Sequence, residues 1–421
     1  MKEKIVSKNG VPVFCEFNQH LHSAKLGLYI RCGAMYEESK NNGITHFFEH
    51  VIFRNINKLM GMNLYKLLDR NAVEFNAVTY KEFMNLYFVF STESLDFVLE
   101  IFEHIFEEIC LTPHEIETER NIIKSEIYEE DDKSSLDYLA EQEIWKKTTL
   151  TQTVLGTPTI LNKITKKKLN SFRKWIFSSG DMFVYLTGNA DLKAAHLIAD
   201  ALSHADITES AAKRLNTAPV PEGFSDRSPS VVVKNGDCLR IQLRFDFFRE
   251  EAQSAEMNLL YDLLFRGDSC LFYSELTEKR GLIYSYTPML EEYCNIGNLR
   301  VGFDVKYQNI DAVLTETVKI FNKVKTADID IESCKAIYKR NCEQLLDDAD
   351  NLNWDRAYYG HIADPDYSPE ERMQLYLKTS KLRISQIAQF LFRIDRLTVA
   401  VKGKKSKISA EKIKQIMNGL K

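Results

Sequence analysis

Residues 46–50 read His-Phe-Phe-Glu-His, a spacing that can place two imidazoles and one carboxylate on one face of a helix. Residues three and four apart are neighbours on a helix surface, so His46 and His50 could bind one metal ion while Glu49 lies beside it. Neutral imidazole is a preferred zinc ligand, and a zinc ion with three protein ligands keeps a fourth position for water. A nearby carboxylate can accept a proton from that water. The pattern therefore favours peptide hydrolysis.

A short motif can also arise by chance, and a pair of histidines on an apolar helix is more often packed or solvated than bound to a metal. The metal hypothesis needs a third ligand, which zinc sites of this kind usually take from a separate helix later in the chain. The candidate is Glu126, in a segment whose isoleucines recur at helical spacing. Glu119 precedes it by two helical turns and shares its face. Because acidic helix faces are usually solvated, spacing alone does not distinguish these two residues from ordinary surface acids.

Further blocks of sequence extend the pattern in a fixed order. They are Gly43-Ile44 before the first histidine, Asn76-Ala-Val-Thr79 as N-A-x-T, Glu119 to Ile127 as E-R-x-x-I-x-x-E-I, Leu155-Gly-Thr157 as L-G-T, and the strand from Met182 that ends in Gly188-Asn189. With these blocks, the chain resembles the pitrilysin and insulinase type of metallopeptidase, the inverzincins, whose zinc motif is H-x-x-E-H.

The resemblance implies a role for each matching residue. It makes His46, His50 and Glu126 the zinc ligands and Glu49 the general base. Glu119 would be a further catalytic carboxylate that holds a liganding imidazole or the reacting water by hydrogen bonding. Without the resemblance, a surface salt bridge is the simpler interpretation of Glu119.

Asn76 and Ala77 are expected to bind substrate. They would lie on an edge strand, and an unpaired strand edge is a template to which an extended peptide can add. The alternative is an ordinary strand start after the turn-like residues 69–71.

The second half of the chain carries one more matching block. Residues 276–285 read L-T-E-K-R-G-L-I-Y-S, which looks like the family's L-R-E-K-R-G-L-A-Y-S. Tyr284 stands at the family's substrate-contacting tyrosine, where a phenol can hydrogen-bond a carbonyl or a developing oxyanion; a half-buried strand tyrosine is the alternative. Thr277 stands where the family has arginine, and threonine cannot supply a planar cation.

In small members of the family, two chains face each other and the second domain of one completes the site of the other. The missing arginine therefore predicts a heterodimer, in which a homologous partner without zinc ligands supplies the arginine and tyrosine. The expected activity is zinc-dependent hydrolysis of short or unfolded peptides, including removal of leader segments from modified peptides. A self-sufficient homodimeric processing peptidase is the first alternative. An inactive structural or peptide-binding subunit is the second.

Composition limits the other classes of function. The net charge of −5 argues against nucleic acid binding. No apolar run reaches the roughly 18 residues needed to span a membrane. Eight cysteines without a C-x-x-C pair, and an N-terminus that enters a strand at once, predict free thiols in the cytoplasm.

The elements that must position these residues form an α+β pattern. Strands are expected at 11–17, 26–32, 73–77 and 85–90 around the zinc helix, with long helices after them. Residues 208–230 resemble a linker because they are rich in Pro, Ser and charge. Strands at 231–234 and 239–247 and a helix at 255–264 then repeat the first half. We therefore expect two related α/β-sandwich-like domains with mixed sheets: a zinc-binding catalytic domain at 1–207, and a domain at 231–421 that lacks metal and completes the substrate chamber.

Overall fold

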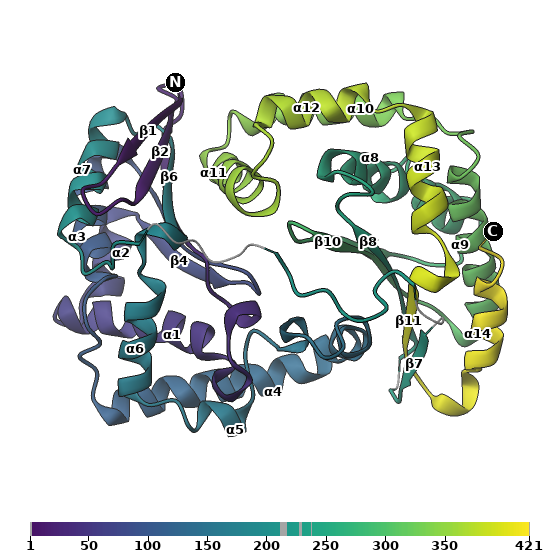
Figure 1. The fold of residues 1–421 in the computed structure, drawn as a ribbon, viewed down its shortest axis with the longest axis horizontal. Helices are drawn as coiled ribbons and strands as arrows, with labels where there is room; N and C mark the ends of the chain where they lie inside the picture. The colour runs from purple at the N-terminus through teal and green to yellow at the C-terminus, as the bar shows by residue number, and fades with distance from the viewer. Residues whose placement is uncertain (1, 211–216, 227–229, 237, 421) are drawn as a thin grey trace. The chain divides into compact units, whose positions relative to one another are not determined.

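Two mixed β-sheets organise the chain in a computed structural model, which describes residues 2–210, 217–226, 230–236 and 238–420 but only the backbone of residues 130–135 (Figure 1). The first sheet has the order β1-β2-β6-β3-β5-β4, in which only the β2–β6 pair is parallel. Its strands are β1 (Lys2–Val6), β2 (Pro12–Phe17), β3 (Ala24–Ile30), β4 (Glu74–Thr79), β5 (Met84–Phe90) and β6 (Met182–Gly188).

The second sheet repeats the first without β1. Its order is β7-β11-β8-β10-β9, and again only one pair, β7–β11, is parallel. Its strands are β7 (Ser230–Lys234), β8 (Arg240–Phe248), β9 (Tyr286–Glu292), β10 (Ile296–Asp304) and β11 (Leu397–Lys402). The expected α+β class with two related sheet-and-helix domains is confirmed, and the strands expected from the sequence begin and end within two residues of the observed ones.

Helices cover both sheets. In the first half they are α1 (Ile44–Leu59), α2 (Leu64–Asn71), α3 (Leu95–His104), α4 (Pro113–Ile144), α5 (Pro158–Leu161), α6 (Lys166–Ile176) and α7 (Leu192–His204). In the second half they are α8 (Ser254–Phe265), α9 (Ile310–Val324), α10 (Glu332–Leu345), α11 (Ala349–Tyr358), α12 (Pro369–Lys378), α13 (Lys381–Leu391) and α14 (Ala410–Met417). A π-helical segment, η6 (Tyr273–Glu278), precedes β9.

The chain forms two compact units, and each unit includes a helical segment from the other half of the sequence. The first unit contains the described residues within 1–132, 152–216 and 343–359. The second contains those within 133–151, 217–342 and 360–421. The ranges expected from the sequence did not include this exchange. The division at 208–230 remains a prediction, and its residues 211–216 and 227–229 lie outside the described residues.

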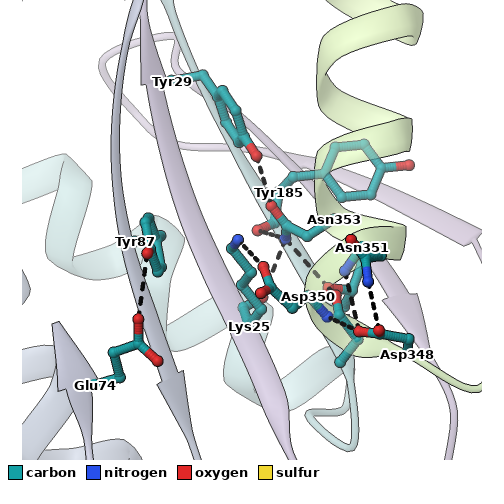
Figure 2. Close-up of polar contacts among 11 residues, drawn as sticks. Lys25, Tyr29, Glu74, Tyr87, Tyr185, Asp348, Asp350, Asn351 and Asn353 are labelled. Atoms are coloured by element: carbon teal, nitrogen blue, oxygen red, sulfur yellow. Dashed lines mark hydrogen bonds and ion pairs between the residues drawn. The ribbon is translucent and has the colours of Figure 1, made fainter. Parts of the chain in front are cut away.

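Helix α11 is the segment that the second half contributes to the first sheet. Figure 2 shows Asn353 of α11 directed at the sheet, where its side-chain oxygen accepts a hydrogen bond from the Tyr29 hydroxyl at 2.8 Å. Its amide nitrogen donates to the carbonyl of Tyr185 at 2.8 Å and to that of Lys25 at 3.2 Å. Asp350, one turn earlier, pairs with the Lys25 ammonium. Strand β3 is buried throughout, because α11 packs on one of its faces, and its Leu26, Leu28 and Ile30 belong to an apolar core that also includes residues of α1 and α3.

Two findings bear on the expectations about environment. In the described part of the chain, no helix combines the length and the apolar character needed to cross a membrane. The eight cysteines are free thiols rather than disulfides.

Candidate active site

The start of helix α1 is held in place by a buried carboxylate. Gly43 precedes the helix with φ of +89°, and a Cβ there would lie 2.7 Å from the carbonyl oxygen of Leu155, so glycine is required. Glu37 accepts hydrogen bonds from the backbone N–H of Gly43 at 2.7 Å and of Thr45 at 2.9 Å, and from the Thr45 hydroxyl at 2.7 Å. These bonds satisfy N–H groups that a helix start leaves without partners. They also fix the turn that carries His46.

The rest of α1 is oriented by its apolar face. Large side chains at helical spacing pack into the core of the first unit: Phe47, Phe48, Val51, Ile52 and Ile56. His46, Glu49 and His50 are therefore left together at one side of the helix, and His46 is buried there while His50 is partly exposed.

Helix α4 brings its carboxylates to α1. Its Ile123 is fully buried in the same core. The guanidinium of Arg120 donates to the carbonyl of Ile164 at 2.9 Å and lies 5.1 Å from the centre of the Phe47 ring. These contacts fix the rotation of α4 about its axis, so that Glu119 and Glu126 both face α1.

Three candidate ligand atoms meet between the two helices. Nε2 of His46 and Nε2 of His50 lie 3.7 Å and 3.5 Å from the same carboxylate oxygen of Glu126. Two atoms that each bond a tetrahedral zinc ion at about 2.1 Å stand about 3.4 Å apart, so this donor set fits zinc closely. Among the described residues, it is the only group of three or more His, Cys, Asp or Glu side chains that converges in this way.

The charges at this point favour a cation. Burial, together with the charge on His50, lowers the pKa of His46, which keeps that imidazole neutral and its lone pair free for a metal. Burial also opposes a charge on His50, but hydrogen bonds to Glu119 and Glu126 outweigh it and raise the pKa of His50 to about 9. The two carboxylates thus already stabilise positive charge at the position where a metal would bind.

Glu49, the candidate base, is held by a residue of the adjacent sheet. The hydroxyl of Thr79, on the neighbouring strand β4, donates a hydrogen bond to its carboxylate. Burial raises the pKa of Glu49 despite that bond. A carboxylate with a raised pKa is a stronger proton acceptor.

Glu119 touches His50 and a residue that sequence reasoning missed. Its carboxylate lies 3.3 Å from Nδ1 of His50, and the Arg54 guanidinium pairs with its other oxygen. Arg54 is one helical turn after His50, and that i, i+4 spacing could have identified it. Thr79 was quoted only as part of N-A-x-T, and nothing in its spacing reveals a contact with a residue 30 positions earlier.

Asn76 and Ala77 lie on β4, which is the edge strand of the first sheet. The backbone N–H of Tyr80 bonds the carbonyl of Phe83 across the turn into β5. Successive residues of a strand point their backbone N–H and C=O groups to opposite sides. Since Tyr80 points to β5, the N–H and C=O groups of Ala77 and Thr79 point to the free edge. The N–H of Ala77 is bonded there at 2.8 Å by the side-chain oxygen of Asn76.

Tyr284 and Thr277 lie in the second unit. Tyr284 occupies a bend before β9 with 95% of its surface exposed, so it is not a half-buried strand residue. Thr277 lies in η6, and its hydroxyl is buried without a hydrogen-bond partner among the described residues.

Comparisons with known proteins point to one family. The family "Insulinase (Peptidase family M16)" matches residues 13–158, and "Peptidase M16 inactive domain" matches residues 163–339. The mitochondrial-processing peptidase subunit beta of Caenorhabditis elegans is 29% identical over 204 residues, which are 47% of this chain and 44% of that protein. A protein of Mycobacterium bovis named as a zinc protease is 23% identical over 332 residues, 77% of this chain and 75% of that one. The match thus spans less than half of the Caenorhabditis relative.

Solved structures share the fold. A protease from Helicobacter pylori superposes with a TM-score of 0.83 at 17% identity, covering 96% of this chain and 99% of that one. An M16-like peptidase from Alicyclobacillus acidocaldarius gives a TM-score of 0.79 at 18% identity over 96% and 98% of the two chains. Two successive family matches, relatives of the same kind and a shared two-domain fold lead to one conclusion. The chain belongs to the insulinase family of peptidases, peptidase family M16.

Proposed function

We propose that this chain is a zinc-dependent endopeptidase that hydrolyses short or unfolded peptides. The observation that carries the proposal is the convergence of His46, His50 and Glu126 on one point, with the partly buried Glu49 beside them. The names of relatives as zinc proteases support the choice of metal.

His46, His50 and Glu126 would hold the zinc ion, and Glu119 would orient His50 through its Nδ1. When bound, zinc supplies a Lewis acid that makes water far more acidic, with a pKa of about 7. Glu49 takes the proton of the water that attacks the amide carbon and passes it to the departing nitrogen. Positioned acid and base catalysis of this kind contributes about 10² to 10⁴ in rate.

The free edge of β4 suits an extended substrate. The backbone groups of Ala77 and Thr79 can pair with a peptide strand, since they point away from β5. The N–H of Ala77 now donates to the side-chain oxygen of Asn76. When substrate binds, the Asn76 side chain would move away, and this N–H would donate to a peptide carbonyl instead. Pairing through the backbone demands an unfolded segment but little particular sequence.

The partner is proposed to be a homologous chain without zinc ligands. Thr277 leaves this chain without the arginine that the family resemblance leads us to expect, and a partner could supply it together with a tyrosine equivalent to Tyr284. Removal of leader segments from modified peptides is an activity that such a pair would suit. The free cysteines support a reducing compartment such as the cytoplasm. The mass of the copurified complex, and the activity of this chain alone, distinguish a heterodimer from a self-sufficient homodimer.

The proposal is tested by metal content and by hydrolysis of quenched peptides. We expect one zinc ion per chain and cleavage of unfolded peptides that stops on chelation and returns with zinc. Zinc bound without any hydrolysis, by this chain alone and with its copurified partner, would instead favour a structural or peptide-binding subunit.

A further inference from the structure

Four aromatic side chains, which we call the aromatic ladder, continue from the end of β4 to helix α11: Tyr80, Phe83, Trp354 and Tyr358. The rings of Tyr80 and Phe83 are stacked with centroids 4.5 Å apart, and Tyr80 is 5.4 Å from Trp354. Trp354 stacks on Tyr358 at 5.3 Å with an interplanar angle of 10°. The ladder lies within the first unit, although α11 comes from the second half of the sequence.

The ladder begins one residue from a contact with the general base. Thr79 donates to Glu49 on the side of the strand that faces α1. Because side chains alternate along a strand, Val78 and Tyr80 lie on the opposite face. Their exposed fractions, 37% and 36%, leave apolar surface there that a ligand can cover.

A peptide strand added to the edge of β4 would present its side chains to both faces. Residues directly opposite each other on paired strands have side chains on the same face, with Cβ atoms about 4.5–5.5 Å apart. A peptide residue opposite Ala77 or Thr79 therefore points toward the metal ligands. The residue next to it points toward Val78 and Tyr80.

We propose that Tyr80, Trp354 and Tyr358 of the aromatic ladder, together with Val78, form a subsite for an aromatic or large aliphatic side chain of the peptide, while the buried Phe83 ring supports Tyr80 from below. That side chain would belong to a residue adjacent to the scissile bond and directed away from the metal. Aromatic rings gain stabilisation from offset or edge contacts with one another beyond simple burial, which suits a Phe, Tyr or Trp. This inference rests on the proposed peptidase function and specifies its substrate class.

The test compares quenched peptides that differ only in having Phe or Ala at each position within two residues of the cleaved bond. We expect the wild-type protein, with its copurified partner, to cleave the Phe peptide at one position with kcat/KM at least about tenfold above that of the Ala peptide. Tyr80→Ala and Trp354→Ala should each reduce that ratio severalfold with little effect on the Ala peptide, and Tyr80→Phe should retain it. Tyr80 is partly exposed, so its substitution keeps the test valid if Trp354→Ala loosens α11.

The matched control is Trp175→Ala, which removes a half-exposed indole from α6 that contacts Phe172. It should leave the ratio unchanged.

Cleavage without a Phe preference, or a preference that survives both ladder substitutions, would overturn the subsite. If no peptide is cleaved, binding of labelled peptides to Glu49→Gln decides. A Phe preference that Tyr80→Ala abolishes would then support the subsite and contradict the peptidase function, whereas equal binding of both peptides would overturn the subsite.

Discussion

The two units share one sheet order but not one chemistry. Helix α1 follows β3 in the first unit, and α8 follows β8 at the corresponding place in the second. Where α1 carries two histidines and a glutamate, α8 carries no histidine. Its Glu256 pairs with Arg383 at 2.7 Å, and its Asp262 accepts from Tyr376 at 2.7 Å. The polar residues of α8 stabilise packing, so the same fold carries the candidate metal site in one unit and packing contacts at the corresponding place in the other.

The edge strands β4 and β9, which occupy corresponding places in the two sheets, also differ in what they can bind. Strand β4 contains no proline, and its edge can offer N–H donors to a peptide. Strand β9 carries Pro288, which has no N–H and weakens the strand as a template. An open edge therefore occurs in the unit that also has the candidate metal ligands.

The largest expected effect is the difference between a Glu→Gln substitution in α1 and one in α8. Glu49→Gln should lower kcat by about 10² to 10⁴ while zinc remains bound, because the amide cannot take a proton from water. Glu256→Gln in α8 should weaken a cap and an ion pair without changing turnover of the folded protein. Peptide hydrolysis and zinc analysis on both variants check this. Activity that persists in Glu49→Gln would show that another group is the base.

The next largest expected effect concerns an arginine–carboxylate ion pair of α1 and one of α8. Arg54→Ala should lower zinc affinity by about 10- to 100-fold, since Arg54 holds the Glu119 that contacts His50. The matched substitution is Arg266→Ala, which removes the guanidinium 3.1 Å from Asp262 on α8. It should leave zinc affinity unchanged. Competition with a chelator of known affinity measures both variants, and equal affinities would mean that Arg54 only stabilises the surface.

Local patterns predicted much of the site because the groups involved are close in sequence or marked by periodicity. His46 and His50 share a helix face through spacing, and the apolar residues around Ile123 indicated α4. The contact of Thr79 with Glu49 could not be predicted, because it depends on how β4 packs beside α1.

The exchange of α11 into the first unit was likewise unpredictable. A helical pattern shows which side of a helix is apolar but not which sheet it will cover. The deciding features are far apart in sequence: Gly27 leaves room where a Cβ would lie 2.7 Å from the Asn353 oxygen, and Gly188 does so for Ala349 at 2.9 Å. Only the folded chain brings these pairs together.

Helix α11, which the second half of the chain contributes to the first unit, allows the stabilities of the two units to be compared. Asn353→Ala should destabilise the first unit by about 1–3 kcal/mol, because the buried hydroxyl of Tyr29 and carbonyl of Tyr185 lose partners. Hydrogen exchange measured peptide by peptide should show the loss in the first sheet and not in the second. Equal loss in both sheets would mean that the two units unfold as one.

The smallest expected effect is a dependence on pH confined to the second unit. Asp137, from the end of α4, contacts Arg244 and Arg300 there. Burial opposes its charge, but the two guanidinium groups outweigh burial and lower its pKa. A carboxylate with a folded pKa below its unfolded value of about 3.9 stabilises the fold above that pH and loses this contribution as the pH falls below it. Asp137→Asn should therefore be less stable than the wild type at pH 6, with a difference that shrinks below about pH 4. Denaturation curves at both pH values measure it, and a difference independent of pH would assign the loss to packing rather than charge.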